Sequence, residues 1–159
     1  MNLIIMRHGE AEPYASSDRD RVLTDYGRQQ AYAAGEWLKA NEIAINYCWA
    51  SPYVRTQQTA ESVQSVYGDL KACIADFLTP GSSPMAVAEQ LRGEATANLL
   101  LISHNPMVSQ LVNYLSSGRT QGPAIMGTAS MAMFDESQWL PGCCSLLWLR
   151  HAPGFEQEF

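Results

Sequence analysis

Three short polar clusters, each directly after an apolar run, hold the residues of this chain that could do chemistry. Each cluster stands where a buried strand is expected to end. The clusters are Arg-His-Gly at 7–9, Ser-Pro-Tyr-Val-Arg at 51–55 and Ser-His-Asn-Pro at 103–106. Because each cluster follows an expected strand and supplies an arginine, a histidine or both, we take them as one candidate site.

The residue types in these clusters favour a site for a phosphoryl group. In a parallel α/β sheet, ligands bind beyond the carboxyl ends of the strands, so we expect the three clusters to meet at one edge of the sheet. That edge would bring together Arg7, His8, Arg55 and His104. Arginine presents paired donors in one plane and keeps its charge at any physiological pH, which suits phosphoryl oxygens.

The elements that must position these clusters follow from the alternation of apolar runs and amphipathic stretches, which is typical of α/β proteins. Continuous apolar runs predict strands that are buried on both faces of a parallel sheet. Thr24 is the expected N-cap of the first helix. The predicted strands are 2–6, 45–50, 70–75, 98–103, 129–134 and 144–149, and the predicted helices are 25–40, 53–67, 85–93 and 106–115.

A short link joins the last two predicted strands, which suits an antiparallel pair and leaves no room for a helical crossover. We therefore expect a three-layer α/β/α sandwich around a mostly parallel sheet of about six strands with one antiparallel strand. The chain has 159 residues, of which 47% are hydrophobic and 16% charged. This composition predicts a single domain over 1–159 with a sizeable core.

The charge balance excludes several classes of function. Ten Lys and Arg against sixteen Asp and Glu give a net charge of -6, a poor basis for binding nucleic acid or an anionic membrane. Five arginines nevertheless lie early in the chain, so a locally positive pocket would select a small anion; they are Arg7, Arg19, Arg21, Arg28 and Arg55. The sequence contains no secretory signal, transmembrane run or metal-type cysteine spacing. We expect a cytoplasmic protein with four reduced cysteines.

The three clusters together resemble the histidine phosphatase superfamily, also called phosphoglycerate mutase-like. The resemblance rests on RHGE at 7–10, SPYVRTQQTA at 51–60 and LLLISHNP at 99–106. Total length, SDRDRVLTDYGRQQA at 17–31 and LTPGSSP at 78–84 are more narrowly similar to the SixA type of phosphohistidine phosphatase. One departure is Val22, where that type usually has proline, which affects the stiffness of the loop more than the chemistry.

The chemistry that we expect is covalent catalysis by His8, whose neutral imidazole would attack phosphorus before water hydrolyses the phosphohistidine enzyme. Arg7, Arg55 and His104 would hold the non-bridging phosphoryl oxygens. We expect the two arginines to lower the pKa of His8, because a positive field disfavours a second positive charge. The second ring nitrogen would donate to a backbone carbonyl in the Gly9 loop. No metal or other cofactor is expected, since the arginines supply the positive charge.

The expected substrate-binding set also includes Gly9, Arg21 and Asn105. Gly9 permits a close approach of the backbone. The resemblance gives Arg21 a role at the rim or in the pocket, which its spacing alone does not. Asn105 could offer its backbone N–H at the start of the following helix.

The proton donor for the leaving group is less well defined by the sequence. An acidic residue often follows the third strand in the wider superfamily, and Asp76 occupies about that place. Asp18 and Glu10 are rivals. The remaining histidine, His151, lies near a Pro- and Gly-containing tail and is interpreted as a surface residue.

The length of chain between Arg55 and His104, 104 − 55 = 49 positions, bears on the size of the substrate. Two helices and two strands fill nearly all of it, which leaves little room for an inserted lid over a small metabolite. An open site suits a phosphoryl group on a protein surface, and the resemblance implies a histidine phosphotransfer domain as partner of a monomeric enzyme. The alternatives are a small-molecule phosphomonoesterase of the same superfamily and a noncatalytic phosphate-binding module.

Overall fold

A seven-stranded mixed sheet forms the centre of the protein in a computed structural model that describes residues 1–94 and 98–157. The strand order is β3-β2-β4-β1-β5-β6-β7. The strands are β1 (Asn2–Arg7), β2 (Tyr47–Ala50), β3 (Lys71–Ile74), β4 (Leu99–Ser103), β5 (Met131–Asp135), β6 (Leu146–His151) and β7 (Glu156–Gln157). Six of these were predicted, and the two-residue strand β7 was not.

Four neighbouring strands, β1 to β4, run parallel, and β5 lies antiparallel beside β1. Strand β6 pairs antiparallel with β5, as the short connection between them predicted, and β7 pairs antiparallel with β6. The expected α/β class with its mostly parallel sheet is therefore confirmed, with β7 as an additional reversed strand at the edge.

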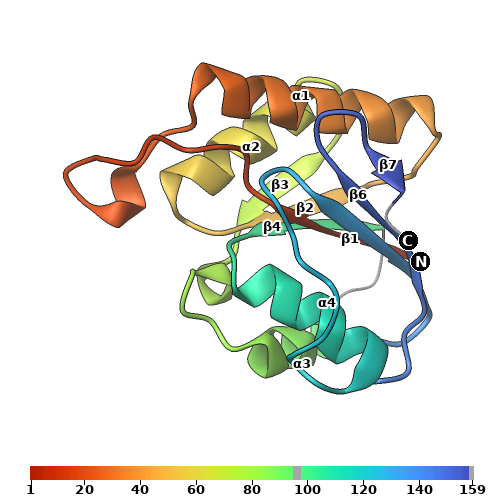
Figure 1. The fold of residues 1–159 in the computed structure, drawn as a ribbon. Coiled ribbons are helices and arrows are strands. Elements are labelled where there is room, and N and C mark those ends of the chain that lie inside the picture. The colour runs from red at the N-terminus through yellow and green to blue at the C-terminus, as the bar shows by residue number, and fades with distance from the viewer. Residues whose placement is uncertain (95–97, 158–159) are drawn as a thin grey trace.

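Two helices cover each face of the sheet, so the molecule has three layers (Figure 1). Helices α1 (Asp25–Ala40) and α2 (Val54–Gln64) lie on one face, and α3 (Pro84–Glu94) and α4 (Met107–Ser117) lie on the other. Strand β1 supplies both faces, because side chains alternate along a strand. Ile4 and Met6 pack in the core under α1 and α2, whereas Leu3 and Ile5 pack with α3 and α4.

The ends of the helices follow local signals. The side chain of Thr24 accepts a hydrogen bond from the Gly27 backbone N–H at 2.9 Å, so α1 begins as predicted. Helix α3 passes the expected stop at Gly93 and continues to Glu94. Helix α4 runs two residues beyond its expected end and stops at Gly118, whose φ of 77° is the left-handed conformation that glycine adopts without strain.

Two further expectations concerned membrane-spanning helices and the state of the cysteines. None of the helices within residues 1–94 and 98–157 is long and apolar enough to span a membrane. All four cysteines are free thiols, of which Cys48 and Cys144 are buried and Cys73 and Cys143 are exposed.

Candidate active site

The ends of β1 and β4 bring the two histidines side by side. The two strands are neighbours with Arg7 opposite Ser103, and the His8 N–H donates to the Ser103 carbonyl at 3.1 Å. The residues that follow, His8 and His104, have ring centroids 5.3 Å apart at an interplanar angle of 60°. Sequence positions 96 apart thus meet at the carboxyl edge of the sheet, as the pattern of strand ends predicted.

His8 is held at both ring nitrogens. Its Nδ1 lies 2.6 Å from the Gly9 carbonyl oxygen, and its Nε2 lies 3.3 Å from Nε of Arg55. A carbonyl only accepts and a guanidinium only donates, so Nδ1 carries the proton and Nε2 carries a lone pair. The tautomer therefore follows from the partners, and Nε2 is the nitrogen that remains available as a nucleophile.

Gly9 is required by packing in the turn that holds His8. A Cβ at Gly9 would collide with the carbonyl of Gly27 at the start of α1, and a Cβ at Gly27 would collide with the Glu10 backbone. The Gly9 N–H donates to the Thr59 hydroxyl at 3.1 Å, and that hydroxyl donates to the Arg55 carbonyl at 2.7 Å. The turn after β1 is thereby fixed to both α1 and α2.

Arg55 lies in the first turn of α2, and only 4% of its surface is exposed. Besides the contact with His8, its Nη1 donates to the Asp18 carbonyl at 2.7 Å, and its Nη2 lies 3.2 Å from Oδ2 of Asp18. The guanidinium also lies over the Tyr53 ring, 5.1 Å from its centroid. Every nitrogen of this buried cation therefore has a partner.

Arg7 faces the cluster from β1 with fewer partners. Its Nη1 donates to the Met126 carbonyl at 3.1 Å, while its buried Nε has no hydrogen-bond partner in the described part of the chain. Burial lowers the pKa of Arg7, and the nearby Arg55 lowers it further. The two guanidinium groups thus act on one another, and an anion between them would relieve this repulsion.

Both histidines are neutral near pH 7. Burial lowers the pKa of His8 to about 4, and the charges of Arg55, Arg7 and Arg21 add to this effect against the raising influence of the Gly9 carbonyl. Burial likewise lowers the pKa of His104 to about 3. The expected direction of the shift is present, but burial rather than the arginines is its largest cause, since His8 is only 6% exposed.

Ser51 positions His104 and was absent from the predicted site residues. It directly follows β2, is fully buried, and its Oγ lies 2.8 Å from Nε2 of His104. The other nitrogen of that ring, Nδ1, is buried without a hydrogen-bond partner in the described residues. The signal was available in the sequence, because Ser51 stands at the carboxyl end of a strand next to the strand of His104.

Arg21 and Asp18 form an exposed rim over this centre. Arg21 donates from Nε to the Glu12 carbonyl at 2.7 Å, and its Nη1 lies 2.9 Å from Oδ1 of Asp18. The hydrogen bond from Arg21 is the largest cause of a lowered pKa at Asp18. Asp18 is therefore ionised, which makes it a poor proton donor.

The remaining candidates, Asn105, Glu10 and Asp76, form no hydrogen bond with either histidine within the described residues. The Asn105 side chain donates from Nδ2 to the Met126 carbonyl at 2.7 Å. The carboxylate of Glu10 accepts from the Thr24 hydroxyl at 3.1 Å. Asp76 is exposed in the turn after β3 and has no hydrogen bond in the described part of the chain. The turn that begins at Asp76 reaches the end of β4, because the Ser103 hydroxyl donates to the Leu78 carbonyl at 2.7 Å.

His151 is not the surface residue that the sequence suggested. It lies in β6, is half-buried, and its Nδ1 is 2.5 Å from Oγ of Ser130. The Ser130 carbonyl accepts the Arg7 backbone N–H at 3.1 Å. His151 is part of the sheet because β6 pairs with β5 and His151 itself pairs with Glu156 of β7, which the tail composition could not indicate.

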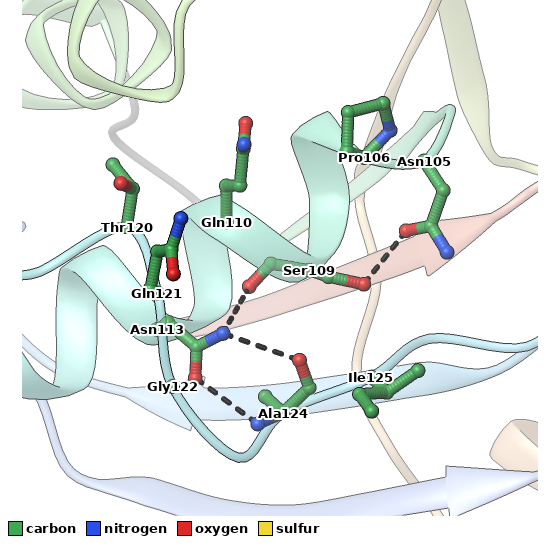
Figure 2. A pocket seen from close by; sticks show the side chains of 10 residues that line it. All are labelled: Asn105, Pro106, Ser109, Gln110, Asn113, Thr120, Gln121, Gly122, Ala124 and Ile125. Carbon is green, nitrogen blue, oxygen red and sulfur yellow. Dashed lines mark hydrogen bonds between the residues drawn. The ribbon is translucent and has the colours of Figure 1, made fainter.

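Two hollows flank the site. One of about 320 Å³ lies beside α4 and is lined by Asn105, Pro106, Ser109, Gln110, Asn113, Thr120, Gln121, Gly122, Ala124 and Ile125 (Figure 2). The other, of about 240 Å³, is lined by Pro13, Tyr14, Ala15, Ser17, Asp18 and Arg21. Within residues 1–94 and 98–157 there is no group of three or more His, Cys, Asp or Glu residues that could hold a metal ion.

Comparison with known proteins gives a consistent set of relatives. Residues 3–77 match the family described as the histidine phosphatase superfamily, branch 1. A phosphohistidine phosphatase SixA homologue of Haemophilus influenzae is 36% identical over 146 residues, which cover 85% of this chain and 89% of that protein. Escherichia coli phosphohistidine phosphatase SixA is 34% identical over 157 residues, 92% of this chain and 96% of its own. A structure of the protein histidine phosphatase SixA with tungstate has 31% identity and a TM-score of 0.82 over 94% of this chain and 96% of that one.

Proposed function

The chain belongs to the histidine phosphatase superfamily, and from this premise we propose that it is a phosphohistidine phosphatase that acts on a histidine phosphotransfer domain. Two of its relatives carry phosphohistidine phosphatase in their names and match most of its length. The observation that carries the proposal is the state of His8, a neutral imidazole whose Nε2 lone pair faces the Arg55 guanidinium.

The first step moves the phosphoryl group from the substrate to His8. Nε2 of His8 attacks phosphorus in line, a new N–P bond forms, and the P–N bond of the substrate phosphohistidine breaks. The leaving imidazole keeps the electron pair of that bond. It needs no strong acid, because it can arrive already protonated at its other ring nitrogen. Such a substrate places little demand on Asp76 as a proton donor.

The second step returns the enzyme to its starting state. Water attacks the phosphoryl group on His8, the N–P bond breaks, and inorganic phosphate leaves together with the proton that water releases. Arg7, Arg55 and His104 bind the non-bridging oxygens in both steps, and Arg21 contributes charge from the rim. These donors supply the charge stabilisation that phosphoryl transfer requires.

The openness of the site supports a protein as substrate. The hollows at its two sides are shallow, and they are bordered by exposed apolar residues, Tyr14 at 88% and Ile125 at 70%. Between Arg55 and His104 the described chain contains α2, β3, a short turn, α3 and β4, with no inserted subdomain over the histidines. A phosphohistidine carried on a helical domain can reach such a site.

Rapid-quench labelling tests the mechanism and the substrate together. The protein is mixed with a radiolabelled phosphohistidine phosphotransfer domain, and we expect a transient acid-labile, alkali-stable label on His8. A label elsewhere, or hydrolysis without any label, would contradict the covalent step. A parallel panel of small phosphomonoesters separates the substrate classes, because faster turnover of the esters would favour the small-molecule phosphatase.

A further inference from the structure

Helix α4 and Asn105, which stands two residues before it, hold the loop 124–126 through a ladder of polar side chains (Figure 2). Asn105, Ser109 and Asn113 are four positions apart and therefore lie on one face. Asn113 exchanges two hydrogen bonds with the Ala124 backbone, each of 3.1 Å. Ser109 Oγ accepts from the Met126 N–H at 2.9 Å and donates to Oδ1 of Asn105 at 2.7 Å.

The direction of each bond in this ladder is determined. The Met126 N–H can only donate, so the Ser109 hydroxyl accepts there and has one proton left for Asn105 Oδ1. Asn105 must then present its Nδ2 to the Met126 carbonyl, which it does at 2.7 Å. A flipped Asn105 amide would set two acceptors against each other. The Met126 carbonyl therefore excludes the flipped amide, and Ser109 holds the other end of the Asn105 amide by donating to Oδ1.

Within residues 1–94 and 98–157, the Met126 carbonyl is also the only hydrogen-bond acceptor of the Arg7 guanidinium, at 3.1 Å from Nη1. The two lone pairs of this oxygen are used by Arg7 and Asn105. The Met126 side chain is fully buried, which fixes the loop from the other side. The orientation of Arg7 thus depends on a carbonyl whose position is set by Ser109.

We infer that Ser109 is a positioning residue for Arg7, acting through Asn105 and the Met126 carbonyl to aim the guanidinium at the bound phosphoryl group. The inference rests on the proposed function in that Arg7 is taken to bind phosphoryl oxygens. Ser109 itself touches no reacting atom. Its effect is to keep Arg7 oriented before substrate arrives, so that binding does not have to order this side chain.

The test compares three serine variants by calorimetric binding of tungstate, a phosphate-like oxyanion, with thermal unfolding as a check on folding. Ser109→Ala should weaken tungstate binding by about tenfold, which corresponds to the loss of one well-placed charged hydrogen bond. Ser109→Thr keeps the hydroxyl and should bind within about twofold of the wild type. Ser116→Ala is the matched control, because Ser116 lies on the same helix and bonds only to the Val112 and Asn113 carbonyls; it should have no effect.

A double-mutant cycle separates positioning from a general structural effect. If Ser109 acts through Arg7, Ser109→Ala should cause no further loss of tungstate binding in an Arg7→Ala protein. Binding by Ser109→Ala at the wild-type level, an equal loss with and without Arg7, or a loss in Ser109→Thr as large as in Ser109→Ala would each overturn the inference. Tungstate binding is measured without turnover. Failure of the protein to hydrolyse phosphohistidine would therefore count against the proposed function, while the binding data would still test the role of Ser109.

Discussion

The buried centre of the site and its exposed rim hold their arginines in different ways. Arg55 in the centre is 4% exposed and contacts the ring of His8 directly. Arg21 at the rim has 29% of its side chain exposed, and its charged partner Asp18 is 55% exposed. The same residue type is therefore buried at Arg55 and partly exposed to solvent at Arg21.

This difference indicates where charge affects the chemistry. Electrostatic interactions are strong where water is excluded and weak where solvent and salt screen them. In the centre, burial and positive charge lower the pKa of His8 and keep its imidazole neutral. The charges at the rim can attract an anion without fixing its position. The following predictions test this distinction, beginning with the variant at the very centre.

Replacing His8 by alanine should have the largest effect. The nucleophile is lost while the arginines remain, so hydrolysis of phosphohistidine should fall by about 10⁴-fold or more, yet tungstate should still bind. Steady-state turnover and calorimetry measure the two properties. Substantial residual turnover by His8→Ala would remove the centre from the mechanism.

Arg55→Ala should come next, with a loss of about 10²- to 10³-fold in kcat/KM, as expected for removal of one oxyanion donor from a preorganised site. The charge of Arg55 lowers the pKa of His8, so the acidic limb of the pH–rate profile should move to higher pH in this variant. Arg92→Ala is the matched control, because Arg92 is an exposed arginine paired only with Glu89 at 2.9 Å. Equal behaviour of the two variants would show that burial does not distinguish them.

The lowered histidine pKa values predict how stability depends on pH. Unfolded His8 and His104 titrate near 6.5, whereas in the folded protein their pKa values are about 4 and about 3. Below pH 6.5 the unfolded state therefore binds more protons, and the free energy of unfolding should fall as the pH drops from about 6.5 to about 4. Urea unfolding at several pH values measures this slope, which should be shallower in His8→Asn. An unchanged slope in that variant would contradict the assigned burial of the neutral ring.

The smallest effect is expected at the rim, from Asp18→Asn. This change removes a negative charge beside Arg55 and keeps the Asp18 carbonyl that binds Arg55 at 2.7 Å. Tungstate binding should tighten by less than about threefold, and stability should change by less than about 1 kcal/mol, because exposed ion pairs contribute little. Asp20→Asn, whose carboxylate bonds to the Ser16 and Ser17 hydroxyls, serves as control. A tenfold loss of tungstate binding in Asp18→Asn would show that the rim fixes the position of Arg55. The proposed difference between the buried centre and the exposed rim would then be wrong.

The sequence predicted the centre well because its parts stand at strand ends. The apolar run before Arg7 and that before Ser103 define neighbouring parallel strands, and parallel order then brings His8 to His104. The helix over Asp25–Ala40 was predicted to the residue, since Thr24 caps it and its apolar stripe is regular. Patterns of this kind depend on local chemistry and one rule of topology.

What the sequence could not predict depends on contacts between distant side chains. Nothing near Arg7 indicates that the Met126 carbonyl, 119 positions away, accepts from its guanidinium. Asn105 was expected to contribute its backbone N–H to the site. The structure shows in addition that its side-chain amide donates to the Met126 carbonyl. Asp76 follows the third strand as expected, but the sequence did not indicate that its turn is tied to β4 by the hydrogen bond from Ser103 to the Leu78 carbonyl.

The position of β1 has a consequence for the durability of the enzyme. This strand has β4 on one side and β5 on the other and is covered by helices on both faces. Its amide protons should exchange with solvent only when the whole sheet opens, because no edge of the strand is free to detach first. Loss of activity on heating should therefore coincide with global unfolding, since the nucleophile is mounted directly after this central strand.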